Sequence, residues 1–261
     1  MALSPSDLAD AADAFWQARQ GAPYPLHLEA SLSQADAYRI NLALTDRHAA
    51  EGKRPSGWKV GLTAKAIQDQ FGLPEPMFAC LFADDRWPSG TTQSLSELTR
   101  PGWENELCLT MGRTLTGPGV TDQQARRAIA SVAPAMEIIE GRTPVSPDGV
   151  NCLIADNGQN RAYVVGAPTP FDADRTDLGA ATVDVFIDGK AADHADGTAV
   201  MESSAVASVV WLANKLAEFG RSLEAGQDIM TGSFTRQHAI DRPMTIEARF
   251  DPFGAAQATF D

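Results

Sequence analysis

The sequence predicts an α+β protein, in which a helical N-terminal part precedes a β-rich remainder. Two observations carry this prediction. Apolar residues recur at helical spacing through the first sixty residues, whereas beyond Gly57 they form short runs separated by Gly and Pro. The length of 261 residues suits one large domain or a domain with an appendage. We therefore expect an N-terminal helical subdomain over residues 1–56 and a β-rich domain over residues 57–261.

Two amphipathic helices are predicted in the N-terminal part. Ser4 is a favourable N-cap with Pro5 at the first helical position, and the helical spacing continues to Gly21. A second helix begins at Ser33 and stops at Gly52.

Strands dominate the remainder, with helices between them. A capping box at Thr121 opens a helix to about Val132, and Ser203 or Ser204 opens another to Gly220. The expected strands are Trp58–Leu62, Glu104–Met111, Ala135–Ile139 and Arg161–Val165. Two hairpins are expected, one pairing Thr182–Ile187 through a turn at Asp188-Gly189 and one pairing Met244–Phe250 with Ala256–Phe260.

Composition excludes several classes of protein. Hydrophobic residues make up 44% and charged residues 21%, as in ordinary globular proteins. No apolar run approaches the ~20 residues of a membrane helix, and the N-terminus lacks the features of a secretory signal, so we expect a cytoplasmic protein that does not enter membranes. The net charge of −13 without a Lys/Arg cluster argues against nucleic-acid binding. Three widely separated cysteines suggest neither a disulfide framework nor a zinc site.

Glu104 and Glu106 stand two residues apart at the head of an apolar strand. Side chains alternate between faces of a strand, so the two carboxylates share a face, roughly 6.6 Å apart along the strand. Such a pair can converge on a hard cation that stabilises both anions. A solvated strand start with two exposed acids is the alternative interpretation.

Two further charged residues lie in apolar surroundings. Glu137 stands inside the apolar run at 132–139, where an unpaired carboxylate is expensive to bury, so it requires a lysine, an arginine or a metal as partner. Lys59 lies in a short strand flanked by glycines. It is a candidate to bind a carboxylate or to act as a base, unless it is a solvated edge-strand lysine.

Taken together, these fragments resemble the 2-keto-4-pentenoate hydratase and 4-oxalocrotonate decarboxylase group within the fumarylacetoacetate hydrolase superfamily. The resemblance covers nearly the whole chain, and the order and spacing of its pieces are specific. The matching pieces are Gly57–Thr63, Glu104–Glu106, Pro134–Ile139, Ala155–Asn157, Trp211–Asn214, Ala225-Gly226 and Thr231-Gly232.

The resemblance implies a function and a set of site residues. Glu104, Glu106 and Glu137 would be the ligands of Mg²⁺ or Mn²⁺, with the 2-oxo and carboxylate oxygens of a small 2-oxo acid completing the shell. It makes Lys59 the catalytic, substrate-contacting or proton-transferring residue of the β-rich domain. The substrate-binding residues that it implies are Asp156, Asn157, Thr231 and Gly232. It also implies a mixed β-roll or sandwich fold and a homo-oligomer.

The chain departs from the family pattern at four places near the expected pocket. Met77-Phe78-Ala79 stands where many relatives have an aspartate, and Gly102-Trp103 replaces a basic residue, for which the nearby Arg100 is a substitute. The other departures are Gly158–Asn160 and Glu202–Ser204. All four leave the three glutamates and Lys59 intact.

The expected activity is hydration of 2-hydroxy-2,4-dienoates, of the 2-oxo-4-pentenoate type, to 4-hydroxy-2-oxo acids. A 2-oxo-enedioate decarboxylase or a C–C hydrolase would use the same metal site, so the ligands do not separate the three reactions. A paralogue that binds 2-oxo acids without turnover is an alternative of a different class, suggested by Met77 and the altered loops.

Overall fold

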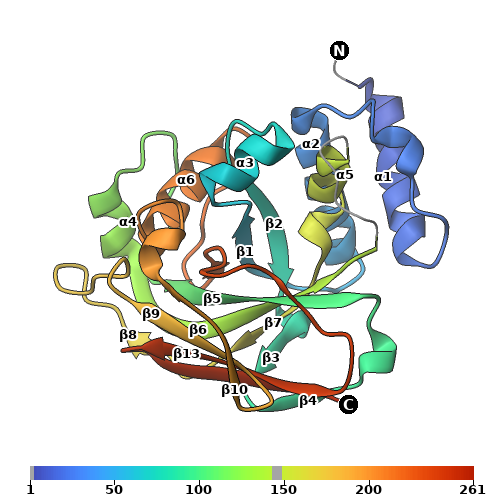
Figure 1. The fold of residues 1–261 in the computed structure, drawn as a ribbon. Coiled ribbons are helices and arrows are strands. Elements are labelled where there is room, and N and C mark those ends of the chain that lie inside the picture. Colours follow the sequence, from blue (N-terminus) through green and yellow to red (C-terminus); the bar gives the residue numbers. More distant parts are fainter. Residues whose placement is uncertain (1–2, 143–148) are drawn as a thin grey trace.

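A computed structural model describes residues 3–142 and 149–261 and confirms the α+β architecture (Figure 1). Within these residues, a curled nine-stranded sheet lies between a layer of helices and a second, five-stranded sheet. The helices are α1 (Pro5–Arg19), α2 (Gln34–Ala50), α3 (Lys65–Phe71), α4 (Asp122–Ala128), α5 (Val150–Ala155) and α6 (Ala205–Ala217). Short 3₁₀ turns are η1 (Leu26–Leu28), η2 (Ala83–Asp85), η3 (Leu95–Glu97), η4 (Asn157–Gln159) and η5 (Gly197–Ala199).

Both N-terminal helices form as predicted. The Ser4 and Ser33 side chains accept hydrogen bonds from backbone N–H groups of the first turns of α1 and α2. Phe15 of α1 and Tyr38 of α2 are fully buried and belong to the main hydrophobic cluster, which also includes residues of the sheets. Strand β1 begins at Pro55, and the division into domains at residue 56 remains a prediction.

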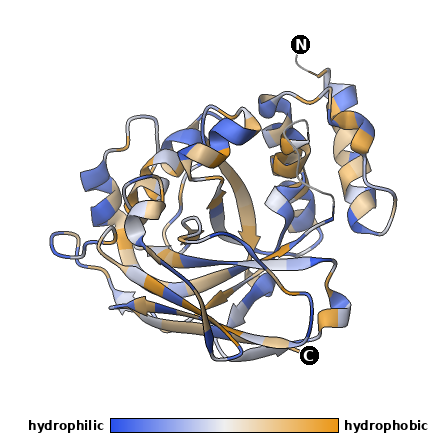
Figure 2. Cartoon of the chain, in the orientation of Figure 1, coloured by the Kyte–Doolittle hydropathy of each residue, from blue (hydrophilic) through white to orange (hydrophobic). Residues whose placement is uncertain are grey.

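The large sheet has the order β2-β1-β11-β5-β6-β7-β3, with β12 paired to β5 and β8 paired to β6. Strand β2 is buried along its whole length, and Figure 2 shows it as largely hydrophobic. The strands are β1 (Pro55–Gly61), β2 (Met77–Phe82), β3 (Arg86–Pro88), β5 (Pro101–Met111), β6 (Ile129–Glu140), β7 (Asn160–Val165), β8 (Thr169–Pro170), β11 (Asp228–Met230) and β12 (His238–Ala239).

The second sheet contains both predicted hairpins. Asp188 and Gly189 have φ angles of 50° and 73°, which suit the tight turn between two strands. The order is β10-β9-β13-β14-β4. Its strands are β4 (Thr91–Gln93), β9 (Thr182–Ile187), β10 (Lys190–Asp196), β13 (Met244–Asp251) and β14 (Gly254–Phe260).

One helix is shorter than predicted. The Thr121 capping box is present, but α4 ends at Ala128 rather than near Val132. Ile129 instead begins β6, where it pairs with Met111 of β5. The long ladder between β5 and β6 thus overrides the local helical pattern.

A side chain bridges the curled sheet between β2 and the segment before β7. Asn157 Oδ1 accepts from the Cys80 N–H at 2.8 Å, and Asn157 Nδ2 donates to the Cys80 carbonyl at 2.9 Å. Both backbone groups of Cys80 thus have a hydrogen-bond partner in the Asn157 amide. These bonds close the curl of the sheet by tying β2 to the segment that precedes β7. No helix in the described part of the chain is long and apolar enough to cross a membrane.

Candidate metal centre

The three predicted glutamates meet on the inner face of strands β5 and β6. Glu104 lies directly opposite Glu137 in the antiparallel register, and Glu106 lies two residues further along β5 on the same face. Carboxylate oxygens of all three lie within 4.8 Å of one another. Glu106 and Glu137 are fully buried and Glu104 is partly buried, so the alternative of a solvated strand start with two exposed acids is not what the structure has.

Each of the two buried glutamates has one oxygen bound by the protein and one left free. Glu106 Oε2 accepts from the Gly232 N–H at 2.6 Å, and Glu137 Oε1 accepts from Asn160 Nδ2 at 2.7 Å. Glu106 Oε1 and Glu137 Oε2 are buried and have no hydrogen-bond partner in the described part of the chain. Buried carboxylate oxygens normally have partners. These oxygens are therefore available to a ligand.

Lys59 supplies a positive charge at the edge of this cluster. Its Nζ lies 3.2 Å from Glu137 Oε1 and donates to the Gly158 carbonyl at 3.3 Å. Strands β1 and β6 are three spacings apart, about 14 Å in a flat sheet. The contact therefore depends on the curl of the sheet and on the full reach of the lysine side chain.

The charges of the cluster shift one another's pKa values. Burial, followed by the charge of Glu137, raises the pKa of Glu104 to about 7. Burial and the charges of Glu137 and Glu104 raise the pKa of Glu106 well above its ordinary range. Burial opposes the charged form of Lys59, but the three carboxylates outweigh burial and raise the pKa of this lysine.

The arrangement fits a divalent metal ion. Mg²⁺ and Ca²⁺ prefer oxygen ligands at about 2.0–2.6 Å, so oxygens on opposite sides of an ion lie within roughly 5 Å. The three carboxylates offer such oxygens, two of them without another partner. Since Lys59 is the one ammonium group of the described residues that pairs with these acids, a cation would also relieve the repulsion that raises the pKa values of Glu104 and Glu106. Glu104, Glu106 and Glu137 are the residues that can hold it.

A cavity of about 580 Å³ leads from the surface to this cluster. Lys59 and Glu104 lie in its wall with Gly158 and Gln159. Gly158 has a φ of 59°, and a Cβ atom there would lie 2.5 Å from the Lys59 side chain. Only glycine therefore allows this backbone to approach the lysine so closely.

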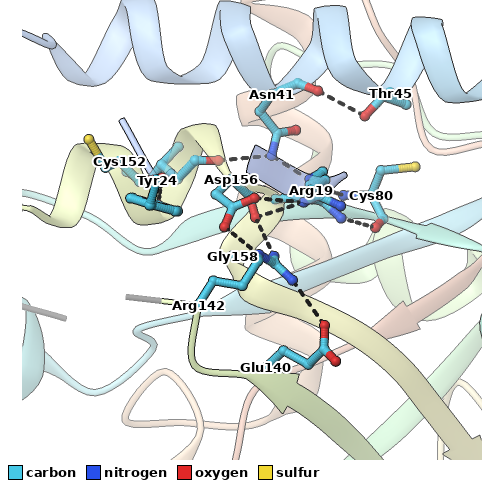
Figure 3. A network of polar contacts seen from close by, with 12 residues as sticks. Arg19, Tyr24, Asn41, Thr45, Cys80, Glu140, Arg142, Cys152, Asp156 and Gly158 are labelled. Carbon is cyan, nitrogen blue, oxygen red and sulfur yellow. Dashed lines mark hydrogen bonds and ion pairs between the residues drawn. The ribbon is translucent and has the colours of Figure 1, made fainter. Parts of the chain in front are cut away.

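Asp156 and Asn157 lie outside the wall of this cavity. The Asp156 carboxylate pairs with Arg19 at 3.0 Å and with Arg142 at 2.7 Å (Figure 3). Arg142 also pairs with Glu140 (Figure 3). Asn157 bridges to Cys80. Both residues thus fix the start of the segment that carries Gly158 and Gln159 into the cavity.

Thr231 and Gly232 directly follow β11 and contact Leu107 and Glu106 of β5. The Thr231 hydroxyl donates to the Leu107 carbonyl at 2.8 Å, and the Thr231 carbonyl accepts from Ser208. Gly232 holds Glu106 through its N–H and has a φ of 107°. A Cβ atom at this position would lie 2.6 Å from the Thr63 side chain. Ser233 and other residues of the following loop, rather than these two, line the cavity.

The departures from the family pattern have different consequences. Met77 is buried beside Gly158 in the cavity wall and supplies no acid or base. Asn160, by contrast, holds a metal-ligand candidate, a role that sequence reasoning missed. A β-bulge pairs Asn160 with Ile139, and no sequence signal beyond a polar residue before an apolar strand marks this role. Gln159, which belongs to the same departure, lines the cavity.

Metal affinity should depend on pH because the raised pKa values of Glu104 and Glu106 favour their protonated forms in the metal-free protein. The raised pKa values of Glu104 and Glu106 mean that these two groups stabilise the metal-free fold most below about pH 4.3, the unfolded value, and that the contribution of Glu104 is lost as the pH rises through 7 and that of Glu106 at higher pH. A divalent cation must displace these protons. We expect tighter Mg²⁺ or Mn²⁺ binding, with less proton release, as the pH rises from about 5.5 to about 8. Titration calorimetry in buffers of different ionisation enthalpy measures both, and pH-independent affinity would contradict the expectation.

Comparison with known proteins places the chain in a family. No protein-family model matches it. It is 30% identical over 262 residues to a 2-keto-4-pentenoate hydratase of Paraburkholderia xenovorans (strain LB400), covering 99% of this chain and 97% of the relative. It is 34% identical over 200 residues to a 2-hydroxyhexa-2,4-dienoate hydratase of Comamonas testosteroni, covering 76% and 75%.

Solved structures point to the same family. A 4-oxalocrotonate decarboxylase from Pseudomonas putida G7, complexed with calcium and acetate, superposes with a TM-score of 0.91 at 27% identity and covers 100% of this chain and 99% of its own. The same enzyme has been solved with magnesium and adipate. The fold is therefore the predicted curled mixed sheet with N-terminal helices. The chain belongs to the 2-keto-4-pentenoate hydratase and 4-oxalocrotonate decarboxylase group of the fumarylacetoacetate hydrolase superfamily.

Proposed function

We propose that the protein is a metal-dependent hydratase that converts 2-hydroxy-2,4-dienoates, of the 2-oxo-4-pentenoate type, into 4-hydroxy-2-oxo acids. The observation that carries the proposal is the cluster of Glu104, Glu106 and Glu137 beside Lys59 at the inner end of a cavity. A relative over 99% of the chain is a 2-keto-4-pentenoate hydratase, and another over 76% of the chain is a 2-hydroxyhexa-2,4-dienoate hydratase.

In this proposal the three glutamates hold Mg²⁺ or Mn²⁺. When bound, such an ion supplies a Lewis acid that draws electron density from the 2-oxo group of the substrate. The oxygens Glu106 Oε1 and Glu137 Oε2 face no other partner in the described chain. Gly232 and Asn160 orient the two carboxylates through their second oxygens.

Lys59 is the proposed proton carrier. An ammonium group has three N–H donors, and the Glu137 carboxylate and the Gly158 carbonyl account for two of them. The third remains for the substrate. Since its pKa is raised in the metal-free protein, Lys59 enters the reaction as an acid and donates a proton to the terminal diene carbon, C5. Water then adds through its oxygen to C4 and returns a proton to Lys59, while the proton lost from the 2-hydroxyl group ends on C3 and leaves the 2-oxo group.

The remaining predicted residues belong to the same proposal. Asp156 and Asn157 would shape the substrate-binding part of the cavity by fixing Gly158 and Gln159. Thr231 and Gly232 would lie next to the substrate carboxylate, on the side of Glu106. We also propose that the protein works as a homo-oligomer.

Decarboxylation of a 2-oxo-enedioate is the second candidate. The superposition on 4-oxalocrotonate decarboxylase over the whole chain favours it, and the same acids and lysine would serve. A binding protein without turnover is the remaining alternative, because Met77 removes a possible acid–base group from the cavity wall.

The hydratase proposal predicts loss of the ultraviolet absorption band of 2-hydroxypenta-2,4-dienoate when the protein and Mg²⁺ are added. Water addition interrupts the conjugated diene, so the band should decline only with metal present. Release of CO₂ from 2-oxo-3-hexenedioate, with no change in the dienoate, would instead identify a decarboxylase. Metal-dependent binding of pyruvate with neither reaction would identify the binding protein.

Replacing Lys59 should slow turnover without weakening metal binding. Because a positioned acid–base group contributes roughly 10²–10⁴-fold, we expect Lys59→Gln to lower kcat at least about 100-fold. Mn²⁺ affinity should stay equal or rise, since a positive charge next to Glu137 is removed. The exposed Lys190 gives a matched Lys→Gln control. Unchanged kcat in Lys59→Gln would rule out the proton-carrier role.

A further inference from the structure

A second cavity lies beside the N-terminal helices and is separate from the one that leads to the glutamates. Its volume is about 600 Å³, and no described residue lines both cavities. The ends of α1 and α2, the turn η2 and the adjoining ends of β6 and β7 form its wall. Four cationic side chains line it, namely Arg19, Lys53, Arg142 and Arg161. In a protein with a net charge of −13, such a concentration of positive charge opposes the global field.

Two of these cations share one buried carboxylate. Arg19 Nη2 lies 3.0 Å from Asp156 Oδ1, and Arg142 Nε donates to Asp156 Oδ2 at 2.7 Å (Figure 3). Both guanidinium groups also donate to the Asp156 carbonyl, at 2.9 and 3.3 Å. Asp156 therefore holds the two arginines close together in spite of their like charges.

The other two cations are joined to this pair through two further carboxylates. Lys53 Nζ lies 3.0 Å from one oxygen of Asp85, and Arg161 Nη1 lies 3.3 Å from the other. Glu140 connects the two groups, with Arg142 at 3.2 Å and Arg161 at 3.9 Å. Four cations thus alternate with three carboxylates in one continuous chain. One positive charge is left without a counterion among the residues that the structure describes.

Several hydrogen-bond donors in this wall have no acceptor in the described part of the chain. Arg19 Nε is buried without a partner, although buried donors normally have one. Lys53 uses one of its three N–H groups, and Arg161 uses one of its five. These donors come from α1, from the loop after α2 and from β7. A ligand in the cavity would thus meet donors from three separate elements.

The pKa values of neighbouring groups also reflect the excess of positive charge. His48 lies in the wall, where burial and then the charges of Arg19 and Lys53 lower its pKa to about 4. Burial lowers the pKa of Arg19 against the charge of Asp156, and the charge of Arg142 adds to the decrease. The cavity thus disfavours a further cation and favours an anion.

We propose that this cavity binds a phosphate group, either free or attached to a small organic molecule, at a site apart from the metal centre. A phosphate presents oxygens in several directions, so it can accept from guanidinium and ammonium groups on three elements, whereas a carboxylate presents two oxygens in one plane. Its negative charge would balance the uncompensated cation. Because one water molecule takes up about 30 Å³ in the liquid, the cavity has room for a small organic group beside the phosphate. Binding here does not depend on the reaction at the glutamate cluster.

Titration calorimetry of the metal-free, full chain with inorganic phosphate tests the site. Metal is left out so that phosphate cannot bind an ion at the glutamates. We expect one phosphate per chain with a Kd of about 1 mM or tighter, the affinity that two charge-assisted hydrogen bonds support. Arg161→Gln should weaken binding at least about tenfold, because it removes a charged donor. Arg236→Gln, at a 77% exposed side chain that lines the first cavity, should keep the wild-type affinity.

A second variant and a second ligand sharpen the test. Lys53→Gln changes a side chain that is 41% exposed, so the result does not depend on the folding of Arg161→Gln alone, and it should weaken binding similarly. Glycerol 3-phosphate distinguishes the two sources of the phosphate group. Tighter binding than inorganic phosphate would indicate a phosphorylated small molecule, and equal or weaker binding would indicate free phosphate, and both results support the site.

Absence of saturable binding to the wild-type protein at up to about 10 mM phosphate would overturn the inference, as would wild-type affinity in both folded variants. Loss of binding in Arg236→Gln would place the phosphate in the first cavity and would also overturn it. Acetate that binds as tightly as phosphate would contradict the preference for a phosphate group.

Discussion

The repulsion among three carboxylates gathered in one small, largely buried space is the constraint on which the rest of the structure depends. Glu104, Glu106 and Glu137 share a face of β5 and β6, and among the residues that the structure describes Lys59 supplies the one ammonium group paired with them. Charges removed from water need partners, and one cation does not balance three anions. In the metal-free protein, the raised pKa values of Glu104 and Glu106 favour bound protons that lower this negative charge. A bound divalent ion would supply the missing positive charge in the active protein.

The curl of the large sheet and a few backbone contacts make this gathering possible. Curling brings β1 close enough for Lys59 to reach Glu137 across two intervening strands. Asn157 holds the closure by bonding to both backbone groups of Cys80. Gly158 lets the same segment approach the lysine without a clash. Asn157 and Gly158 thereby determine where Lys59 lies relative to Glu137.

The sequence predicts the charged residues of the site better than the residues and pairings that position them. Glu104 and Glu106 follow from strand alternation, and the apolar neighbours of Glu137 show that it needs a partner. Hairpins and N-terminal helices follow from caps and turns. The role of Asn160 and the end of α4 do not, because a bulge between β6 and β7 and the β5–β6 ladder decide them. These are pairings between segments that local patterns do not encode.

Metal binding by glutamine variants tests the central claim most directly. Electron paramagnetic resonance titration of the full chain with Mn²⁺ should give one tight site. Glu106→Gln and Glu137→Gln should each weaken it at least about 100-fold, since each removes a charged ligand, and Glu97→Gln, an exposed control, should not. Wild-type Mn²⁺ affinity in both folded cluster variants would contradict the account.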